Sequence, residues 1–551
     1  MTVKSSYPTA LALALAALLA VGCGSSGSDD DGGGASAGQQ GGAITIAQGS
    51  QPDALDPALA YTSNSWEPLW LVYTAPLTYK RAEGTEGAEL IPGVATDLPE
   101  ISEDGRTYTF TIRDGLEYSD GTPVKASDFE HAIKRVLNLE SGGTYLFEGI
   151  EGATEYIEAG DPEGDIAGIE ADDATGEVTV RLTAADGSFS NVLATSFAGL
   201  VPSSTPFRNM TEDPPPGVGP YAITESVPNR QFVMEKVDGF DIPGIPAGNL
   251  DTITTEIVKS PARAAQDVID GRLDYMQDPP PTDLAAEIRE AHADRYKEWP
   301  TLSVNYFFLN QSLPPFDDEK VREAVNVGLD STAIARILGG RLSGSCNIVP
   351  DGIPGHSERE CPFGDPDGPG DVEAAKKLIE EAGATGEKVT VWANNDATRP
   401  EIGQYYTGLL DEIGLDADLK VIDGAIYFDT IGNVKTRAQT GLANWYADFP
   451  HPATFLQQVD GTAIQPTANG NYGMVDDPEI NEEIAELLTE TDLPSVADRW
   501  EALDERVIDR SYIAPYGSEE LTTFLSDRMD FENCSLVHPL YGNDYSSFCL
   551  K

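Results

Sequence analysis

Strand and helix patterns alternate through the second half of this 551-residue chain. Strands separated by helices usually lie parallel in one sheet, because each helix returns the chain to the same end of the sheet. The alternation therefore predicts an α/β unit with a largely parallel sheet. Its predicted strands are 302–310, 388–393 and 417–422, and its predicted helices are 284–296, 317–338, 371–383, 400–413 and 494–509.

The first half of the chain has strand patterns with fewer helices between them. Alternation of apolar and polar residues is typical of half-buried strands. A predicted helix, 128–139, follows Ser127, and Glu130 would complete a capping box. At roughly 150 residues per domain, the chain is long enough for more than one folding unit. The remaining predicted strands are 43–48, 107–113, 177–182, 231–236, 249–258, 272–276 and 512–516, and the remaining predicted helix is 261–270.

The first 42 residues lack the pattern of a folded domain. The apolar run from Ala10 to Val21 is shorter than the ~20 residues that span a bilayer, and it is typical of a secretory signal. Small residues precede Cys23, as in the lipobox of bacterial lipoproteins; an ordinary signal peptide with an incidental cysteine is the alternative. The sequence therefore predicts a signal peptide over 1–22, and a lipidated Cys23 with a flexible tether over 23–42.

The charge of the chain excludes two classes of partner. Asp and Glu number 92 against 35 Lys and Arg, which gives a formal net charge of -57. Nucleic-acid binding needs a basic face, and attachment to an anionic membrane surface needs a polybasic patch. No long basic run occurs in the sequence, so we expect the protein to bind neither nucleic acid nor, through charge, an anionic membrane surface.

The number and spacing of the cysteines are consistent with export from the cytoplasm. Apart from Cys23, four cysteines form two local pairs, each 15 residues apart. Outside the cytoplasm, even and local cysteines indicate disulfides, although free buried thiols are the alternative. We predict the disulfides Cys346–Cys361 and Cys534–Cys549. No CxxC occurs and the five histidines lie far apart in the sequence, so no metal site is predicted.

Several segments resemble one known family. Residues 106–129, RTYTFTIRDGLEYSDGTPVKASDF, resemble the signature of family 5 extracellular solute-binding proteins of ABC importers, the oligopeptide- and dipeptide-binding proteins and their relatives. Further similar segments follow in the family's order. They are LDPA (55–58), GVGPYAITES (217–226), FFLNQSLPPFDDEKVREAVNVGLD (307–330), DVEAAKKLIEEAG (371–383) and NWYADFPHPATFL (444–456).

The resemblance implies a fold and a function. The fold is α/β, a two-lobe periplasmic-binding-protein-like fold (type II, cluster C-like) with an extra subdomain in lobe 1. The implied function is capture of a peptide, or another amine-bearing solute, by hinge closure, and delivery to an ABC permease with its ATPase. The protein would be a monomer without cofactor, lipid-anchored to the outer face of the bacterial cell membrane. The implied divisions are lobe 1 at 43–290 with a subdomain at about 76–204, lobe 2 at 291–508, a return to lobe 1 at 509–551, and crossings near 280–300 and 505–516.

The resemblance also implies the ligand site. In peptide-binding members, the aspartate at the position of Asp448 pairs with the ligand's α-ammonium, whereas His451 stands where the family usually has Asp. A carboxylate buried in a closed cleft needs a cation, and the ligand would supply it. An ordinary turn aspartate and core aromatics are the alternative interpretation. The other residues expected to face the ligand are Asn444, Trp445, Tyr446, Tyr145, Tyr61, Ser63 and Asn64.

Other functions remain open at this point. On the same fold the ligand could be an oligosaccharide, a metal chelate or haem, or the protein could sense peptides. An aromatic cleft without a buried carboxylate would favour sugars. The sequence holds no G-x-S-x-G, H-E-x-x-H or Walker loop, so no enzyme is predicted. The acidic pairs Asp53/Asp56 and Asp317/Asp318 are predicted to be solvated turns and caps rather than catalytic groups.

Overall fold

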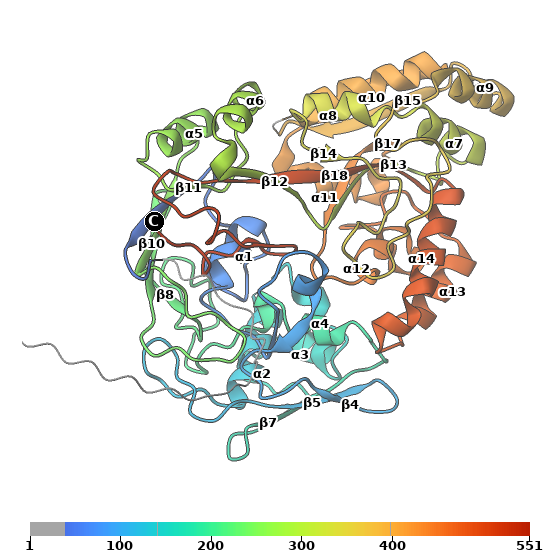
Figure 1. Ribbon diagram of the computed structural model, residues 1–551. Helices are drawn as coiled ribbons and strands as arrows, with labels where there is room; N and C mark the ends of the chain where they lie inside the picture. Colours follow the sequence, from blue (N-terminus) through green and yellow to red (C-terminus); the bar gives the residue numbers. More distant parts are fainter. Residues whose placement is uncertain (1–38, 140, 397) are drawn as a thin grey trace, which may run out of the picture. The chain divides into compact units, whose positions relative to one another are not determined.

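The computed structural model describes residues 39–139, 141–396 and 398–551 (Figure 1). The predicted signal peptide, Cys23 and nearly all of the tether therefore lie outside the described residues. Within the described ranges, no helix has the length and apolar character needed to cross a membrane.

One five-stranded sheet contains the first strand of the described chain. In this sheet β1 pairs in parallel with both β10 and β11, whereas β9 pairs antiparallel with β8 and β10. Helix α5 (Pro261–Ile269) begins with Ser260, whose side chain accepts from the Arg263 N–H. The order of strands is β11 (Tyr275–Met276), β1 (Ala43–Gln48), β10 (Thr252–Ile257), β9 (Gln231–Lys236) and β8 (Tyr221–Val227).

A separate antiparallel sheet with its own apolar core lies between β1 and β8 in the sequence. Its core includes Tyr108 and Phe110 of β5 and Phe129 and Ile133 of α2, which are all buried. The strands are β4 (Glu100–Ile101), β5 (Thr107–Thr111), β7 (Glu177–Arg181) and β6 (Ile169–Asp172). The hairpin β2 (Leu77–Tyr79) and β3 (Leu90–Pro92) and the helices α1 (Ser63–Leu69), α2 (Ser127–Asn138), α3 (Ala153–Ala159) and α4 (Phe189–Val192) belong to the same stretch of chain.

The predicted capping box before α2 is not formed. Ser127 is already the first residue of the helix, and both its N–H and its hydroxyl donate to Asp173, at 2.9 and 3.1 Å. Glu130 instead accepts from the Ile166 N–H and pairs with Lys134. Asp173, which is distant in the sequence, has replaced the local cap. Sequence spacing cannot reveal such a long-range partner.

The largest sheet is mixed, so the prediction of a largely parallel sheet is wrong. β15 pairs in parallel with β16 and β17, but β13 pairs antiparallel with both β17 and β18. Periodicity identifies strands but does not say which strand becomes a neighbour. The order is β12 (Tyr296–Pro300), β18 (Ile513–Phe524), β13 (Ser303–Leu309), β17 (Thr440–Tyr446), β15 (Lys388–Asn394) and β16 (Asp416–Ile422), and β14 (Leu342–Ser343) pairs with β18.

Helices cover both faces of this sheet (Figure 1). Successive side chains of β13 enter two different cores: Tyr306 and Phe308 pack on one face, and Phe307 and Leu309 on the other. A strand covered on both faces is apolar throughout, which explains the unbroken run in the sequence. The helices are α7 (Glu319–Gly328), α8 (Ser331–Ile337), α9 (Val372–Ala382), α10 (Arg399–Ile413), α11 (Tyr427–Ile431), α12 (Ala453–Leu456), α13 (Pro478–Leu487) and α14 (Leu493–Asp509).

Two predicted helices have different bounds. The helix predicted over 317–338 is divided, because Asp330 caps α8 by accepting from the Ala333 N–H. The helix predicted over 284–296 is α6 (Thr282–Ala291), and Tyr296 instead begins strand β12. Tyr296 and Trp299 are buried in that strand, whose pairing with β18 replaces the helical turns.

The chain returns to its beginning after β18. Leu525, Met529, Tyr545 and Phe548 join the same apolar core as Ile44. A bridge pairs Gln39 with Leu550, and Arg528 bonds the Ala43 carbonyl at 3.4 Å. The short strands β19 (Val537–His538) and β20 (Gly542–Asn543) lie in this return segment. The lobe boundaries given above remain predictions.

The structure forms one of the two predicted disulfides. Cys534 is bonded to Cys549, as predicted. Cys346 and Cys361 are free thiols, so the predicted Cys346–Cys361 disulfide is corrected. A hydrogen bond to Cys361 and burial raise the pKa of the Cys346 thiol. An even spacing of cysteines does not decide which pairs are bonded, because a disulfide needs a specific geometry that spacing alone does not supply.

The acidic pairs have separate structural roles. Asp318 caps α7, as predicted, by accepting from the Lys320 N–H. Asp56 is not solvated as predicted: it is fully buried, and Arg135 of α2 donates to both of its carboxylate oxygens at 2.8 and 2.7 Å. Asp53 holds the turn before α1, because the Tyr61 N–H and the Thr62 hydroxyl donate to it.

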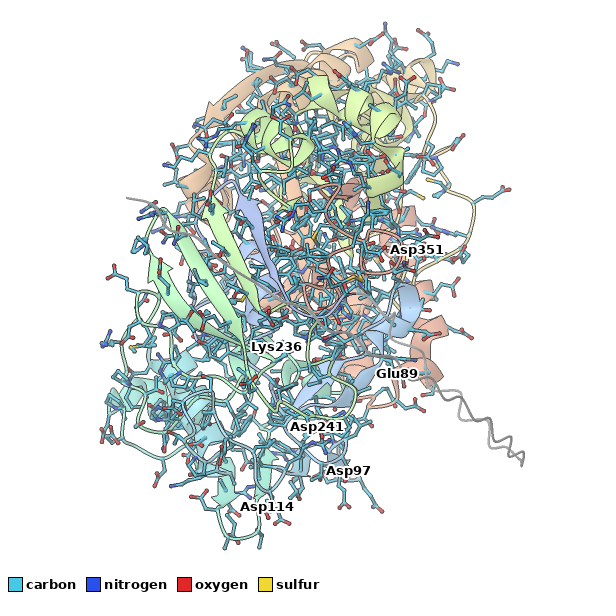
Figure 2. The ribbon with its side chains drawn as sticks, turned by 60° about the vertical axis from the view of Figure 1, so that its left-hand side comes forward. Glu89, Asp97, Asp114, Lys236, Asp241 and Asp351 are labelled. Carbon is cyan, nitrogen blue, oxygen red and sulfur yellow. A yellow bond between two sulfur atoms is a disulfide. The ribbon has the colours of Figure 1, made fainter. Side chains whose placement is uncertain are left out.

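Exposed carboxylates surround these cores. Figure 2 labels Glu89, Asp97, Asp114, Asp241 and Asp351, all of which are exposed. With a net charge of -57, these groups repel one another, and dissolved salt screens that repulsion. The exposed acidic residues therefore affect surface hydration and charge repulsion, and they do not determine the fold.

Candidate functional site

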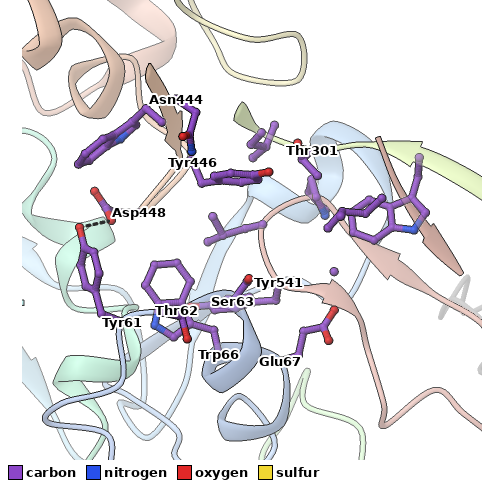
Figure 3. Close-up of a pocket in the computed structure, with 18 of the residues that line it drawn as sticks. Tyr61, Thr62, Ser63, Trp66, Glu67, Thr301, Asn444, Tyr446, Asp448 and Tyr541 are labelled. Atoms are coloured by element: carbon purple, nitrogen blue, oxygen red, sulfur yellow. Dashed lines mark hydrogen bonds between the residues drawn. The ribbon is translucent and has the colours of Figure 1, made fainter. Parts of the chain in front are cut away.

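A cavity of about 440 Å³ gathers residues from distant parts of the chain (Figure 3). This volume lies in the range of roughly 300–1,000 Å³ that is usual for small-ligand sites. The walls come from the start of α1, from β12 and the turn after it, from the end of β17, and from the C-terminal return. The lining positions are 61–63, 66, 67, 299, 301, 302, 428, 444–448, 472, 521 and 539–542.

Asp448 is held by three hydroxyl groups. Tyr145 donates to Oδ2 at 2.7 Å, Tyr61 donates to Oδ1 at 3.2 Å, and Thr454 donates to Oδ2 at 3.2 Å. The residue is only 7% exposed, and burial raises the pKa of its carboxyl to about 6 despite these hydrogen bonds. Among the described residues no Lys, Arg or His forms an ion pair with it. The arrangement is a desolvated carboxylate that lacks a cation.

Local structure explains how Asp448 is presented. It lies two residues beyond β17, whose Asn444 and Trp445 face Asn305 and Val304 of β13 in register. The Trp445 indole N–H donates to the Thr454 hydroxyl at 3.0 Å, and that hydroxyl donates to Asp448. Trp445 therefore both lines the cavity and positions a hydrogen-bond donor to the carboxylate.

Tyr61 and Tyr145 reach Asp448 from the first half of the chain, Tyr61 from a loop and Tyr145 from the short 3-10 helix Thr144–Leu146. The Tyr61 ring packs against Trp66 and Phe197, with ring centroids 6.0 and 5.9 Å apart. Tyr145 is 42% exposed, yet its hydroxyl makes the shortest hydrogen bond to Asp448. Burial and the nearby Asp448 carboxylate raise the pKa of the Tyr61 hydroxyl, which therefore stays protonated and donates.

A second carboxyl group, Glu67 of α1, lines the same cavity. It is 6% exposed and accepts from the Tyr545 hydroxyl at 2.7 Å, from the Asn543 N–H at 3.2 Å and from Gln277. Burial raises the pKa of its carboxyl to about 7. Glu67 thus joins α1 to the C-terminal return and adds a partly ionised group to the cavity.

The structure brings most of the predicted site residues together. Tyr61, Ser63, Asn444, Trp445, Tyr446 and Asp448 line the cavity, and Tyr145 joins them through Asp448. Asn64 does not line it; its side chain donates to the Ser50 hydroxyl at 2.8 Å.

His451 lies behind the cavity rather than in it. Its ring is 2% exposed, 5.6 Å from that of Trp500, and its Nδ1 accepts from the Ala453 N–H at 3.1 Å. Burial lowers the pKa of His451 to about 4, so the ring is neutral at physiological pH.

Sequence reasoning missed most of the walls. The missed residues are mostly aromatic or apolar, and they come from several separate segments that no spacing connects. The WEP sequence beside the predicted Tyr61 loop was the one available signal, because it places Trp66 and Glu67 within two helical turns of it. The missed positions are 62, 66, 67, 299, 301, 302, 428, 447, 472, 521 and 539–542.

Comparison with known proteins defines the class. Residues 89–466 match the middle region of the bacterial extracellular solute-binding proteins, family 5. The fold is that of the two-lobe periplasmic binding proteins. The chain belongs to family 5 of the bacterial extracellular solute-binding proteins.

Similar proteins cover nearly the whole chain. The oligopeptide-binding protein OppA of Bacillus subtilis (strain 168) is 26% identical over 527 residues, covering 90% of this chain and 91% of its own. The probable D,D-dipeptide-binding periplasmic protein DdpA of Escherichia coli (strain K12) is 22% identical and covers 85% and 86%. Among solved structures, clavulanic acid biosynthesis oligopeptide binding protein 2 superposes with a TM-score of 0.84 at 25% identity, covering 94% and 99%.

Proposed function

We propose that the protein is the receptor of an ABC importer and captures a peptide or another amine-bearing solute in the cavity at Asp448. Delivery to a membrane permease and its ATPase, anchoring through a lipid on Cys23, a monomeric state and the absence of catalysis belong to this proposal. The names of the relatives, several of which are peptide-binding proteins, support the ligand class. The lobe divisions at 43–290, 291–508 and 509–551 belong to it as well.

One observation carries the proposal: a buried carboxylate faces an aromatic cavity and has hydroxyl partners, but no cation among the residues that the structure describes. An ammonium group entering the cavity would supply the missing charge, which favours binding because the desolvation of Asp448 has already occurred. Contacts to both lobes would favour the closed state, since only differential affinity shifts a conformational equilibrium.

Two features of the cavity favour an amine over an oligosaccharide or a metal chelate. An oligosaccharide site would pair aromatic walls with a cavity free of buried carboxylates, whereas this cavity contains Asp448 and Glu67. A chelate held by imidazoles would need histidines, and none stands among the described residues that line it. Both observations favour an amine.

Blocking the ligand's amine tests the proposal. We expect a pool of C-terminally amidated peptides two to eight residues long to bind the purified wild-type protein in native mass spectrometry and calorimetry. The same pool, N-acetylated, should bind at least about tenfold more weakly, because it cannot offer an ammonium to Asp448. Equal binding of the two pools would refute the amine-binding function.

Acidification should weaken amine binding. With the pKa of Asp448 raised to about 6, protons compete with the ligand below that pH. The dissociation constant should stay nearly constant from pH 8 to 7 and rise about tenfold by pH 5. His451 stays neutral over this range, but Glu67, with a pKa of about 7, also titrates in the cavity. Calorimetry of Asp448→Asn over the same range isolates the Glu67 contribution, and an identical pH profile in both proteins would contradict the assignment to Asp448.

A further inference from the structure

The walls of the cavity are dominated by rings. Eight aromatic side chains line it, among them Trp66, Trp299, Trp445 and Tyr541. Aromatic faces attract cations as well as apolar groups, because the ring quadrupole is negative above and below the plane. The walls therefore suit an apolar or aromatic body that also carries positive charge.

The charged groups of the cavity all have one sign. Asp448 and Glu67 lie on opposite sides of the view in Figure 3, with aromatic residues between them. The lining positions, all of them described residues, include no Lys, Arg or His. A ligand inside this cavity meets carboxyl groups from two directions and no fixed cation.

The basic residues near the walls either form ion pairs with carboxylates or lie outside the lining. Arg399 pairs with Glu519 at 2.7 Å, and Arg81 pairs with Asp544 at 3.1 Å and lies over the Trp70 ring. Arg341 acts electrostatically on Tyr446 and Glu520 but is not part of the lining. Arg399 and Arg81 are therefore already paired with carboxylates, whereas Arg341, whose Nε has no hydrogen-bond partner among the described residues, lies outside the lining.

A short peptide with a free C-terminus would bring such a carboxylate into the cavity. Removing a charge from water costs several kcal/mol when no opposite charge compensates for it. Here the carboxylate would also be repelled by Asp448 and by the ionised form of Glu67. Its presence would push the pKa of Glu67 still higher, whereas a cation would lower it.

We propose, building on the amine-binding function above, that the cavity selects cationic ligands with an apolar or aromatic body and no carboxylate within the cavity. C-terminally amidated dipeptides and comparable hydrophobic amines belong to this class. Dipeptides with a free C-terminus do not.

Three ligand pools of equal side-chain composition test this. They are random hydrophobic dipeptides, the same dipeptides as C-terminal amides, and the N-acetylated amides. By competition in native mass spectrometry at pH 7.5, the amides should bind at least about tenfold more tightly than the free acids, and the acetylated amides should lose this affinity. Free acids that bind as tightly as amides, or no binding by either pool, would overturn the selection proposed here.

The pools also separate this inference from the proposed function. Equal binding of acids and amides together with loss on N-acetylation leaves the amine function intact and refutes only the selection against carboxylates. No effect of N-acetylation refutes the amine function itself.

A matched pair of variants adds a second readout. Ser63 lines the cavity and is exposed, so both Ser63→Lys and Ser63→Met are compatible with folding. The lysine should improve binding of free acids relative to amides by about tenfold, because it supplies the missing cation, while the methionine of similar length should leave the ratio unchanged. An unchanged ratio in Ser63→Lys, verified as folded by its melting temperature, would count against the proposal.

Discussion

Replacing Asp448 with Asn will lower the affinity for a peptide with a free N-terminal amine by about 100-fold. The variant keeps the shape of the side chain but removes the charge that an ammonium requires. Removing one partner of a buried charge pair costs roughly 2–5 kcal/mol, and about 1.4 kcal/mol is a factor of ten. Isothermal titration calorimetry against wild type measures the change directly.

The exposed Asp418 on β16 provides the control. Asp418→Asn removes the same charge from a position outside the cavity lining, and it should change the affinity less than twofold. The melting temperature of Asp448→Asn should not fall, because its carboxyl already has a raised pKa and ionisation of a buried group costs stability. A loss of affinity below threefold would contradict the role given to Asp448.

Replacing Asp56 with Ala will cost about 3–5 kcal/mol of the free energy of unfolding, because it leaves the Arg135 guanidinium buried without its counter-charge. Neither side chain of this pair is exposed, and Asp56 also accepts from the Met210 N–H at 3.0 Å. The substitution therefore loses the only carboxylate bonded to Arg135 among the described residues together with a backbone partner. Urea denaturation followed by tryptophan fluorescence measures the change.

Two further variants distinguish the pair from an ordinary surface contact. Glu86→Ala breaks the exposed pair with Lys80 and should leave the free energy of unfolding nearly unchanged, because solvent screens an exposed ion pair. The double variant Asp56→Leu with Arg135→Met should cost less than the two single changes added together, since neither charge is then left alone. Additive costs would show that the two side chains contribute independently.

Local pattern predicted the elements of the fold better than their connections. The run at β13, the amphipathic α9 and the long α14 follow from periodicity, which short-range packing enforces. The antiparallel position of β18 beside β13, and Asp173 as the partner of Ser127, depend on residues far away in the sequence. Such partners are chosen by tertiary packing, which no local window contains.

The candidate site divides in the same way. Asp448 and its neighbours were accessible to prediction because they form one short motif after a strand. Phe428 and Tyr472 were not, because they stand in separate segments, helix α11 and a later loop, and meet only in the folded chain, with ring centroids 6.1 Å apart. The WEP sequence was the only signal for Glu67, because its partners Asn543 and Tyr545 lie far away in the sequence.

The packing of the C-terminal return against β1 has a consequence for biogenesis. The apolar core around Ile44 also contains Tyr545 and Phe548, which lie far along the chain from β1. During synthesis this core therefore stays incomplete until the return segment has been made. Incomplete apolar cores are prone to aggregate, so a nascent chain of this kind depends on holding factors until that segment is available.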